Sequence, residues 1–381
     1  MEIIVVGAGV SGLAVAHELA AHHHVTVLEA APGPRGGGYM IDLFGPGFAA
    51  AERIGVMPAL RSRAHLFRGV RYEAADGTPT GRLDAAPLIE AADGRYFSIL
   101  RPDIEQALLS CLPGSARIRY GARVDAVRDA GADHAEVVLA DGEVLGADLV
   151  VGCDGVRSAV RAALLPQHAA VIPMGFRAAS FLLEAPQLAA ELGDWALMTD
   201  TVGRIGGLYA CDERRIALFL AEQVDRLDVA RPAPDRDRLQ RAYQGLHPLI
   251  DGALPLCPET FYDDLVAQST APRWSVGRIV LAGDAAHAVS LLAGQGASLA
   301  IAGAEALGRS LRASGPHIGA GLAEYERRFR PIADRAQRSG RRSASAFIPA
   351  TAAQLRMQQL GRRALDVPGV ARILTRRFIA A

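Results

Sequence analysis

The spacing of hydrophobic and polar positions near the N-terminus changes twice within thirty residues. Residues 2 to 6 form a short apolar run, residues 10 to 21 are rich in Ala and Leu, and Val25 and Val27 flank Thr26 in a second run. Short β-branched runs are typical of strands, whereas the longer Ala and Leu stretch is typical of a helix. The pattern therefore predicts a β-α-β unit.

Further along, segments of mixed α/β pattern alternate with segments of mainly β pattern. Turns such as Asp76-Gly77 and Asp93-Gly94 predict antiparallel strands between about 66 and 97, and Arg101 to Leu112 predicts a helix. Further strands are predicted around 122–127, 135–139, 143–151, 171–183, 205–211 and 215–221.

These segments predict an α/β chain in which two domains are interleaved in sequence. A Rossmann-like domain is expected at 1–65, 98–165 and 273–345, and a mainly antiparallel β-sheet domain at 66–97 and 166–272. A C-terminal helical segment is expected at 346–381. A length of 381 residues is consistent with more than one hydrophobic core.

Composition and charge narrow the class of partner. The chain has 41 basic and 41 acidic residues, so no overall field attracts it to nucleic acid or to an anionic membrane. It contains no lysine and no asparagine, which excludes a P-loop lysine, a Schiff-base lysine and N-glycosylation. We expect a small-molecule partner.

The cysteines and apolar runs predict a cytoplasmic protein without a membrane span. Its four cysteines are far apart and form no CxxC pair, and no apolar run reaches the roughly eighteen residues that a spanning helix needs. The last thirty residues mix leucines with arginines. They allow a membrane-surface helix, but Pro368 interrupts them, which favours a helix packed across the two domains.

The first motif is Gly7-Ala8-Gly9-Val10-Ser11-Gly12, between the first strand and the first helix. Gly7 permits a tight turn, Gly9 lets a pyrophosphate approach the backbone, and Gly12 allows close packing of the helix. Glu29 ends the second strand, where a carboxylate can bind a ribose hydroxyl. The unit predicts a dinucleotide site that takes FAD or NAD rather than NADP.

The second motif runs from Asp148 to Arg161 and contains Asp154-Gly155. An apolar strand leads into a turn in which backbone N–H groups and a carboxylate can bind a polar ligand. The residues alone are equally consistent with a strand, a turn and a capped helix.

The third motif places Gly283-Asp284 directly after an apolar strand, and Gly294-Gln295-Gly296-Ala297 follows it at the start of an alanine-rich helix. Asp284 can accept a hydrogen bond from a ribityl hydroxyl. The N-terminus of the helix can stabilise the negative charge that develops on a reduced flavin.

Together and in this order, the three motifs resemble the class A flavoprotein monooxygenases, the p-hydroxybenzoate hydroxylase-like family, over nearly the whole chain. The stretch Arg35 to Leu43 and the helix opening Leu100-Arg101-Pro102 resemble the branch with tetracycline-inactivating and aromatic polyketide hydroxylases. The resemblance implies FAD, NADPH or NADH as cosubstrate, and O2, with hydroxylation by a flavin C4a-hydroperoxide. The Rossmann-like domain would then bind FAD and the antiparallel domain the substrate.

The resemblance also assigns residues. It implies that Arg101 contacts the ribityl-pyrophosphate region, that the Asp154 turn serves both FAD and NADPH, and that Met40 lies near the flavin ring. The full predicted cofactor set is Gly7, Gly9, Ser11, Gly12, Glu29, Arg35, Arg101, Val124, Asp154, Gly155, Gly283, Asp284, Gly294, Gln295, Gly296 and Ala297.

Two departures from the family fall at the third motif. Ser290-Leu291-Leu292 stands where relatives carry a proline pair, and Ser298 where they carry an asparagine. The proline segment shapes the substrate site in the family, so altered or lost hydroxylation is an open alternative. Leu292 and Gly294 are expected near the flavin, and no side chain is assigned as catalytic because the chemistry is centred on the flavin.

Several other residues are weighed as functional candidates. Consecutive histidines at 22 to 24 point in different directions, so no metal site is expected, and His287 is expected to have a packing role. Phe181, Tyr209 and Phe219 lie on strand-like segments that could cover the flavin. Phe181 and Tyr209, with Met40, are the predicted substrate contacts, and Tyr209 is preferred.

The leading hypothesis is an NAD(P)H-dependent monooxygenase that hydroxylates an aromatic or polyketide-like small molecule. The alternative is an FAD-binding protein with a non-redox activity, such as a cyclase. A halogenase is disfavoured because Trp195 and Trp274 form no WxWxIP signature, and a simple NAD dehydrogenase because it leaves the Asp284 motif unexplained. The sequence leaves the oligomeric state open.

Overall fold

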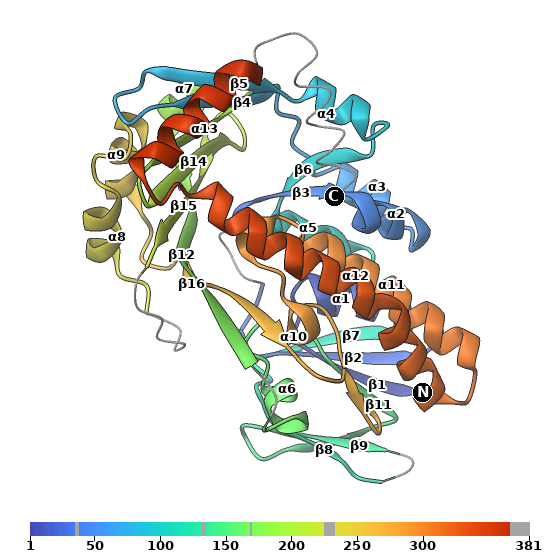
Figure 1. The fold of residues 1–381 in the computed structure, drawn as a ribbon. Coiled ribbons are helices and arrows are strands. Elements are labelled where there is room, and N and C mark those ends of the chain that lie inside the picture. The colour runs from blue at the N-terminus through green and yellow to red at the C-terminus, as the bar shows by residue number, and fades with distance from the viewer. Residues whose placement is uncertain (35–37, 132–133, 168–169, 225–232, 366–381) are drawn as a thin grey trace.

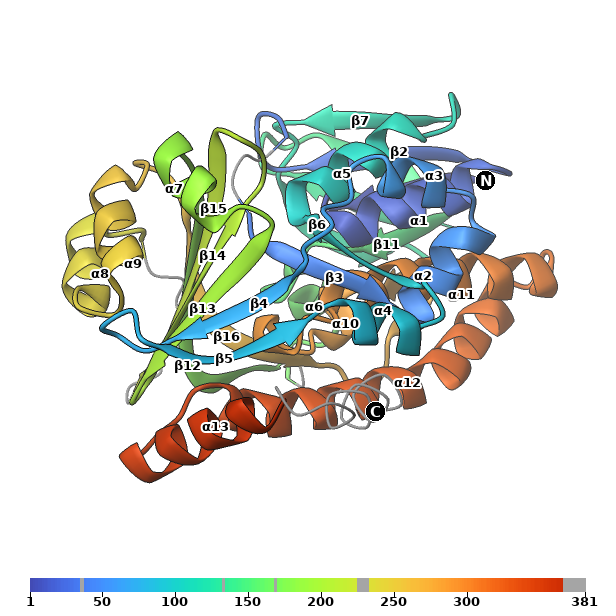
Figure 2. The same cartoon turned by 90° about the horizontal axis from the view of Figure 1, so that it is seen from above.

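The computed structural model describes the chain except for residues 35–37, 132–133, 168–169, 225–232 and 366–381. Two large sheets lie on opposite sides of the molecule, and a long helix, α12 (Ile318–Phe347), runs from one towards the other (Figures 1 and 2). The predicted α/β class with interleaved sheets and C-terminal helices is confirmed.

The first sheet has six strands in the order β17-β18-β11-β1-β2-β7, all parallel to their neighbours except β17. Its strands are short, apolar and largely buried, as parallel strands covered on both faces must be. Their bounds are β1 Glu2–Val6, β2 His24–Glu29, β7 Ala116–Tyr120, β11 Leu149–Gly152, β17 Ser275–Val276 and β18 Ile279–Leu281.

One group of helices packs around the first sheet and its hydrophobic core. Helix α1 packs against both α5 and α11, and α11 packs along α12. Their bounds are α1 Val10–Ala20, α2 Gly45–Arg53, α3 Met57–Arg61, α5 Arg101–Ser110, α6 Ala159–Leu164, α10 Asp284–His287 and α11 Gly296–Ser314. A small antiparallel sheet, β8 (Val124–Asp129), β9 (Ala135–Leu139) and β10 (Val144–Ala147), extends from it.

The second sheet has seven strands in the order β16-β12-β15-β14-β13-β4-β5, antiparallel except for the pair β13 and β4. Helices α7, α8 and α9 cover the face turned away from the first sheet (Figure 2). The bounds are β4 Gly69–Glu73, β5 Pro79–Asp84, β12 Ala170–Glu184, β13 Trp195–Thr201, β14 Arg204–Ala210, β15 Arg215–Gln223, β16 Tyr262–Thr270, α7 Pro186–Leu192, α8 Arg236–Tyr243 and α9 Pro248–Ala253.

A two-stranded ribbon lies between the two large sheets. It pairs β3 (Met40–Phe44) with β6 (Tyr96–Leu100), and α4 (Ala86–Ala91) precedes β6. Residues predicted as one strand at 143–151 form two strands in different sheets, and β13 and β16 were not predicted. The domain boundaries stay a prediction.

The C-terminal part of the chain forms two helices. Helix α12 continues through Pro331, where a proline removes a hydrogen bond, and it packs along α11. Helix α13 (Ala352–Leu365) packs on β5, and no helix among the described residues has the length and apolar character that crossing a membrane requires.

Candidate functional site

The glycine turn after β1 packs tightly against the strand next to it. Gly7 has φ of +101°, and a Cβ there would lie 2.6 Å from the Cys153 carbonyl oxygen. A Cβ on Gly12 would lie 1.8 Å from the Gly7 carbonyl oxygen. Because Gly9, the residue before α1, gives no side-chain cap, the first N–H groups of the helix are available to a ligand.

Glu29 lies at the end of β2 beside this turn. Its carboxylate accepts hydrogen bonds from the backbone N–H groups of Ala8 (2.9 Å) and Ala31 (2.8 Å), which fix its orientation. Together with Gly7, Gly9, Arg101, Val124, Asp154 and Gly155, it lines a cavity of about 300 Å³, which we call the glycine-turn cavity.

Arg101 starts α5 and lines the glycine-turn cavity close to Gly9. Its guanidinium pairs with Glu105 at 2.9 Å. Burial lowers the pKa of Arg101, but the negative potential of Glu105, Tyr39 and Asp284 outweighs it and raises the pKa. A fixed positive charge at this point suits a pyrophosphate.

The second motif contributes both a ligand-facing turn and a structural link. Asp154 lines the glycine-turn cavity and accepts hydrogen bonds from Ser158 Oγ (2.5 Å) and the Val160 N–H (3.1 Å). Burial raises its pKa. Arg161 donates to the Ala285 carbonyl oxygen (2.9 Å), which ties the second motif to the third.

The third motif lies against the first. Gly283 has φ of +60°, and a Cβ there would lie 2.4 Å from Ser11 Oγ, so this contact needs glycine. Asp284 lines a second cavity of about 370 Å³, the central cavity, and burial raises its pKa. The turn residues Gly294, Gly296 and Ala297 line the same cavity.

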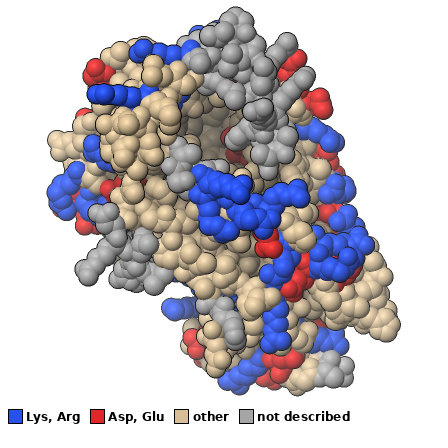
Figure 3. Space-filling model, viewed as in Figure 1, with Lys and Arg blue, Asp and Glu red and all other residues tan. Residues whose placement is uncertain are grey.

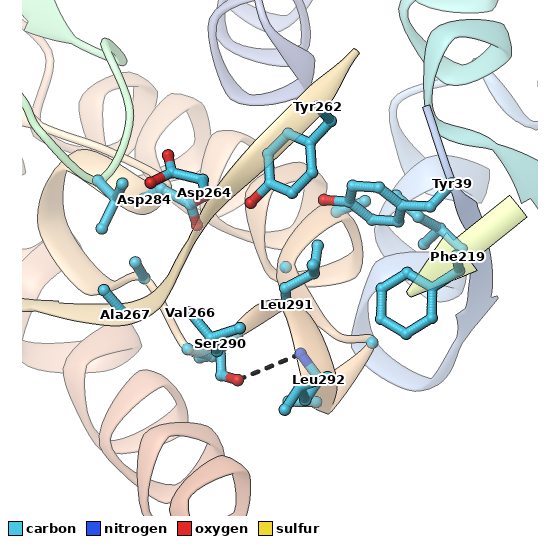
Figure 4. Close-up of a pocket in the computed structure, with 18 of the residues that line it drawn as sticks. Tyr39, Phe219, Tyr262, Asp264, Val266, Ala267, Asp284, Ser290, Leu291 and Leu292 are labelled. Atoms are coloured by element: carbon cyan, nitrogen blue, oxygen red, sulfur yellow. Dashed lines mark hydrogen bonds between the residues drawn. The ribbon is translucent and has the colours of Figure 1, made fainter. Parts of the chain in front are cut away.

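Aromatic and aliphatic side chains enclose the rest of the central cavity. Tyr39, Phe219 and Tyr262 gather on one side of it, with Leu291 and Leu292 near them (Figure 4). The Tyr39 ring lies 5.8 Å from that of Tyr262 and 6.5 Å from that of Phe219, and burial raises the pKa of Tyr39 to about 12. Such walls exclude water from a bound ring system.

A third cavity, the side cavity, adjoins the central cavity. It has about 240 Å³, and the two share Met40, Asp42, Tyr209 and Phe347. The face of the molecule that includes α12 is hollowed in its upper part, and basic side chains gather just below the hollow (Figure 3).

Most predicted site residues lie at these cavities. Ser11, Gly12, Gly283 and Gln295 line none of the three, while Arg35 lies outside the described residues. Leu292, Met40 and Tyr209 line the central cavity.

Phe181 requires a correction. It lies 1% exposed in the core beneath α7 to α9, with its ring 5.9 Å from that of Phe261. Phe181 is paired with Leu218 across β12 and β15, whereas Ser180 is paired with Phe219. Because side chains alternate between the faces of a sheet, Phe219 faces the cavity and Phe181 does not, which removes Phe181 from the substrate contacts.

Sequence reasoning missed several residues of the central and side cavities. Tyr262 gives no motif signal. Tyr39 and Asp42 lie inside the family-like stretch from Arg35 to Leu43, but the pairing of Asp42 with Ser98 could not be inferred. That stretch was the one available signal, and only Arg35 and Met40 were assigned from it.

His287 has the packing role that was expected. It is 3% exposed, and its ring lies 5.1 Å from that of Trp274 and 5.4 Å from that of Phe329. Burial lowers its pKa to about 4, so the ring is neutral at pH 7.

The fold and the three motifs define an FAD-binding protein of the monooxygenase type. A family model described as "FAD binding domain" matches residues 1–339, and the chain belongs to this family, the class A flavoprotein monooxygenases that its motifs resemble.

The chain is similar to several individual proteins over most of its length. An uncharacterized protein of Mycobacterium tuberculosis strain H37Rv is 31% identical over 352 residues, which cover 88% of this chain and 91% of the relative. The 3-amino-4-hydroxybenzoate 2-monooxygenase PtnB3 of Streptomyces platensis is 30% identical over 338 residues, covering 85% and 83%. The crystal structure of the tetracycline destructase Tet(51) has the same fold, with a TM-score of 0.82 at 20% identity and coverage of 98% and 97%.

Proposed function

We propose that this chain is an NAD(P)H-dependent monooxygenase that uses FAD and O2 to hydroxylate an aromatic or polyketide-like small molecule. The observation that carries the proposal is the convergence of all three motifs on two cavities, one polar and glycine-lined, the other walled by aromatic side chains. Bound FAD would supply hydride acceptance and oxygen activation.

The residues of the chain fit such a cofactor. Glu29 is oriented to accept hydrogen bonds from the ribose, and Arg101 to pair with the pyrophosphate. The N-terminus of α11, at Gly296 beside Asp284, faces the central cavity, where a helix dipole stabilises negative charge on a ring system.

Besides binding FAD, the protein must exclude water, and the walls of the central cavity serve this purpose. Tyr39, Phe219 and Tyr262 enclose one side, and the segment from Ser290 to Leu292 another. We infer that the substrate binds beyond Met40 and Tyr209, in the side cavity, and that residues 66–97 and 166–272 form the substrate domain.

The test begins with the purified protein. Bound flavin gives an absorption band at roughly 450 nm. NADPH and NADH oxidation is then measured with and without phenols, and incorporation of an oxygen atom from labelled O2 is followed by product mass. Substrate-stimulated oxidation with label in the product supports the proposal. Product formed without NAD(P)H and O2 would replace it with the non-redox alternative.

Two glycine variants provide a matched pair for cofactor binding. Gly12→Ala places a Cβ against backbone, so we expect loss of FAD from the purified protein. Gly114→Ala meets no atom within 4 Å at a position without positive φ, so it should retain FAD.

A further inference from the structure

Two carboxyl groups line the side cavity among mainly aromatic and apolar side chains. Asp84 lies 3.4 Å from Arg82, whereas Asp42 has hydroxyl groups beside it. Asp42 lies in β3 opposite Ser98 of β6, whose Oγ donates a hydrogen bond to Asp42 Oδ1 at 2.6 Å. The Tyr96 hydroxyl also hydrogen-bonds to this carboxyl group. Asp42 keeps part of its surface exposed to the cavity, while the surrounding protein excludes bulk water and raises its pKa.

Aromatic rings lie around Asp42 in the lining of the side cavity. Tyr209 lines both cavities, and its ring lies 6.0 Å from that of Phe67, which lines the side cavity. Tyr72, Tyr96 and Met198 complete this wall. A flat ring can stack there while a polar substituent reaches the carboxyl group of Asp42.

Positive charge is missing from the described lining of the central and side cavities. The chain has no lysine, and no arginine lines either cavity among the described residues. His65 is the one basic side chain there, and it lies 3.6 Å from Asp103.

Two arginines close to the cavity linings are engaged by carboxylates. Arg157 binds Asp264 through two bonds of 2.6 Å. Arg362 lies over the Tyr72 ring at 4.4 Å and binds Asp200. Among the other acidic side chains of the two linings, Asp84 lies 3.4 Å from Arg82, and Arg101 and Arg161 act electrostatically on Asp284. Asp42 differs from them, because the described residues place hydroxyl groups and no cation beside it.

This lining opposes a carboxylate ligand. A carboxylate brought out of water without a counter-ion loses its solvation, and a neighbouring carboxyl group adds repulsion or must be protonated. The relative from Streptomyces platensis is named for a hydroxybenzoate, which carries such a group. The described cavity of this chain offers an acceptor instead of a counter-ion.

We propose that the substrate of this chain has no carboxylate at the side cavity and presents an N–H or O–H group, neutral or cationic, to the carboxyl group of Asp42. This rests on the proposed function, because it deepens the substrate class of the same site. Among ring compounds, the cavity selects those that bring a neutral or cationic hydrogen-bond donor to Asp42 over those that bring a carboxylate.

Three ring compounds of similar size test the preference for charge. They are benzylamine, benzamide and benzoate, of which only the benzoate lacks an N–H or O–H donor, titrated into the FAD-loaded protein without NAD(P)H while heat or flavin absorbance reports binding. We expect the amine and the amide to bind at least about tenfold more tightly than the benzoate. Equal or tighter binding of the benzoate would overturn the proposal, as would the failure of all three to bind at millimolar concentration.

Variants assign the preference to Asp42. Asp42→Asn should weaken the amine at least about tenfold and leave the benzoate equal or tighter. Asp76→Asn makes the same charge change in the exposed turn between β4 and β5 and should leave the ranking unchanged. An amine preference that persists in Asp42→Asn refutes the role of Asp42, and the wild-type ranking decides the question even if that variant does not fold.

The two proposals fail in different ways. Absence of flavin or of NAD(P)H oxidation in the same preparation would refute the proposed function. Bound flavin and turnover combined with a preference for the benzoate would refute only the substrate class.

Discussion

The buried imidazole of His287 makes the stability of this protein depend on pH in a predictable direction. Its pKa in the folded chain is lowered to about 4 by burial, against roughly 6.5 for an exposed histidine. Between these values the unfolded chain binds a proton that the native state does not, so stability rises with pH. The contribution is fully present above about pH 6.5 and is lost as the pH falls towards 4.

The magnitude follows from the two pKa values. One pKa unit corresponds to about 1.4 kcal/mol, so His287 should cost about 2 kcal/mol of unfolding free energy between pH 7 and pH 5. His287→Phe fills the same aromatic surroundings of Trp274 and Phe329 without a titrating group.

The assay is urea denaturation of the FAD-loaded protein at pH 7 and pH 5. The wild type should lose about 2 kcal/mol more than His287→Phe and His287→Gln between the two pH values. Replacement of the exposed His22 by glutamine should not change the loss. If wild type and the His287 variants lose the same stability, His287 does not titrate as a buried neutral base and the reasoning is refuted.

Three further predictions concern strain, a buried ion pair and the cofactor carboxylate. Ser290 has φ of +124°, where a side chain is strained, so Ser290→Gly should be more stable than Ser290→Ala by about 1 kcal/mol or more in thermal unfolding. Arg362→Met leaves the 2% exposed Asp200 without its cation and should lower the stability of the protein by about 3 kcal/mol. The loss should appear as earlier proteolysis of α13, and combining Arg362→Met with Asp200→Leu should recover part of it. Glu29→Gln turns an amide N–H group towards the backbone N–H groups that now donate to the carboxylate. It should weaken FAD binding at least about tenfold in fluorescence titration, whereas Glu2→Gln should leave FAD binding unchanged.

The sequence predicted the elements whose pattern is local and missed those that depend on pairing. The β-α-β unit, the helix from Arg101 and the strands at 171–183, 205–211 and 215–221 all form. Residues 143–151 could not be divided by pattern, because both halves are strand-like and only partners distant in sequence place them in separate sheets. Strand β16 was missed because its buried Asp263 and Asp264 pair with Arg177 and Arg157, which hides the apolar pattern of a buried strand.

The candidate site shows the same division between features set by the local sequence and features set by distant pairing. Glycine turns and the carboxylates that follow strands carry their geometry in the local sequence, so the predicted cofactor positions could be assigned from motifs. The substrate side depends on which face of a strand a residue occupies. Phe181 and Phe219 looked equivalent, and only the register between β12 and β15 separates them. The Asp42 and Ser98 pair likewise joins residues 56 positions apart.

Contacts among the three motifs explain why together they indicated more than any one of them. Gly7 lies against the Cys153 carbonyl group of the second motif, Gly283 of the third lies against Ser11 of the first, and Arg161 of the second binds the Ala285 carbonyl oxygen of the third. Each motif therefore restricts the residues allowed in the other two. Ser290 has φ of +124°, whereas proline requires φ near −65°, so the proline pair that the family resemblance implies would not fit this backbone at position 290. Mutual packing therefore holds the three motifs in place, and we expect FAD binding to depend on these contacts.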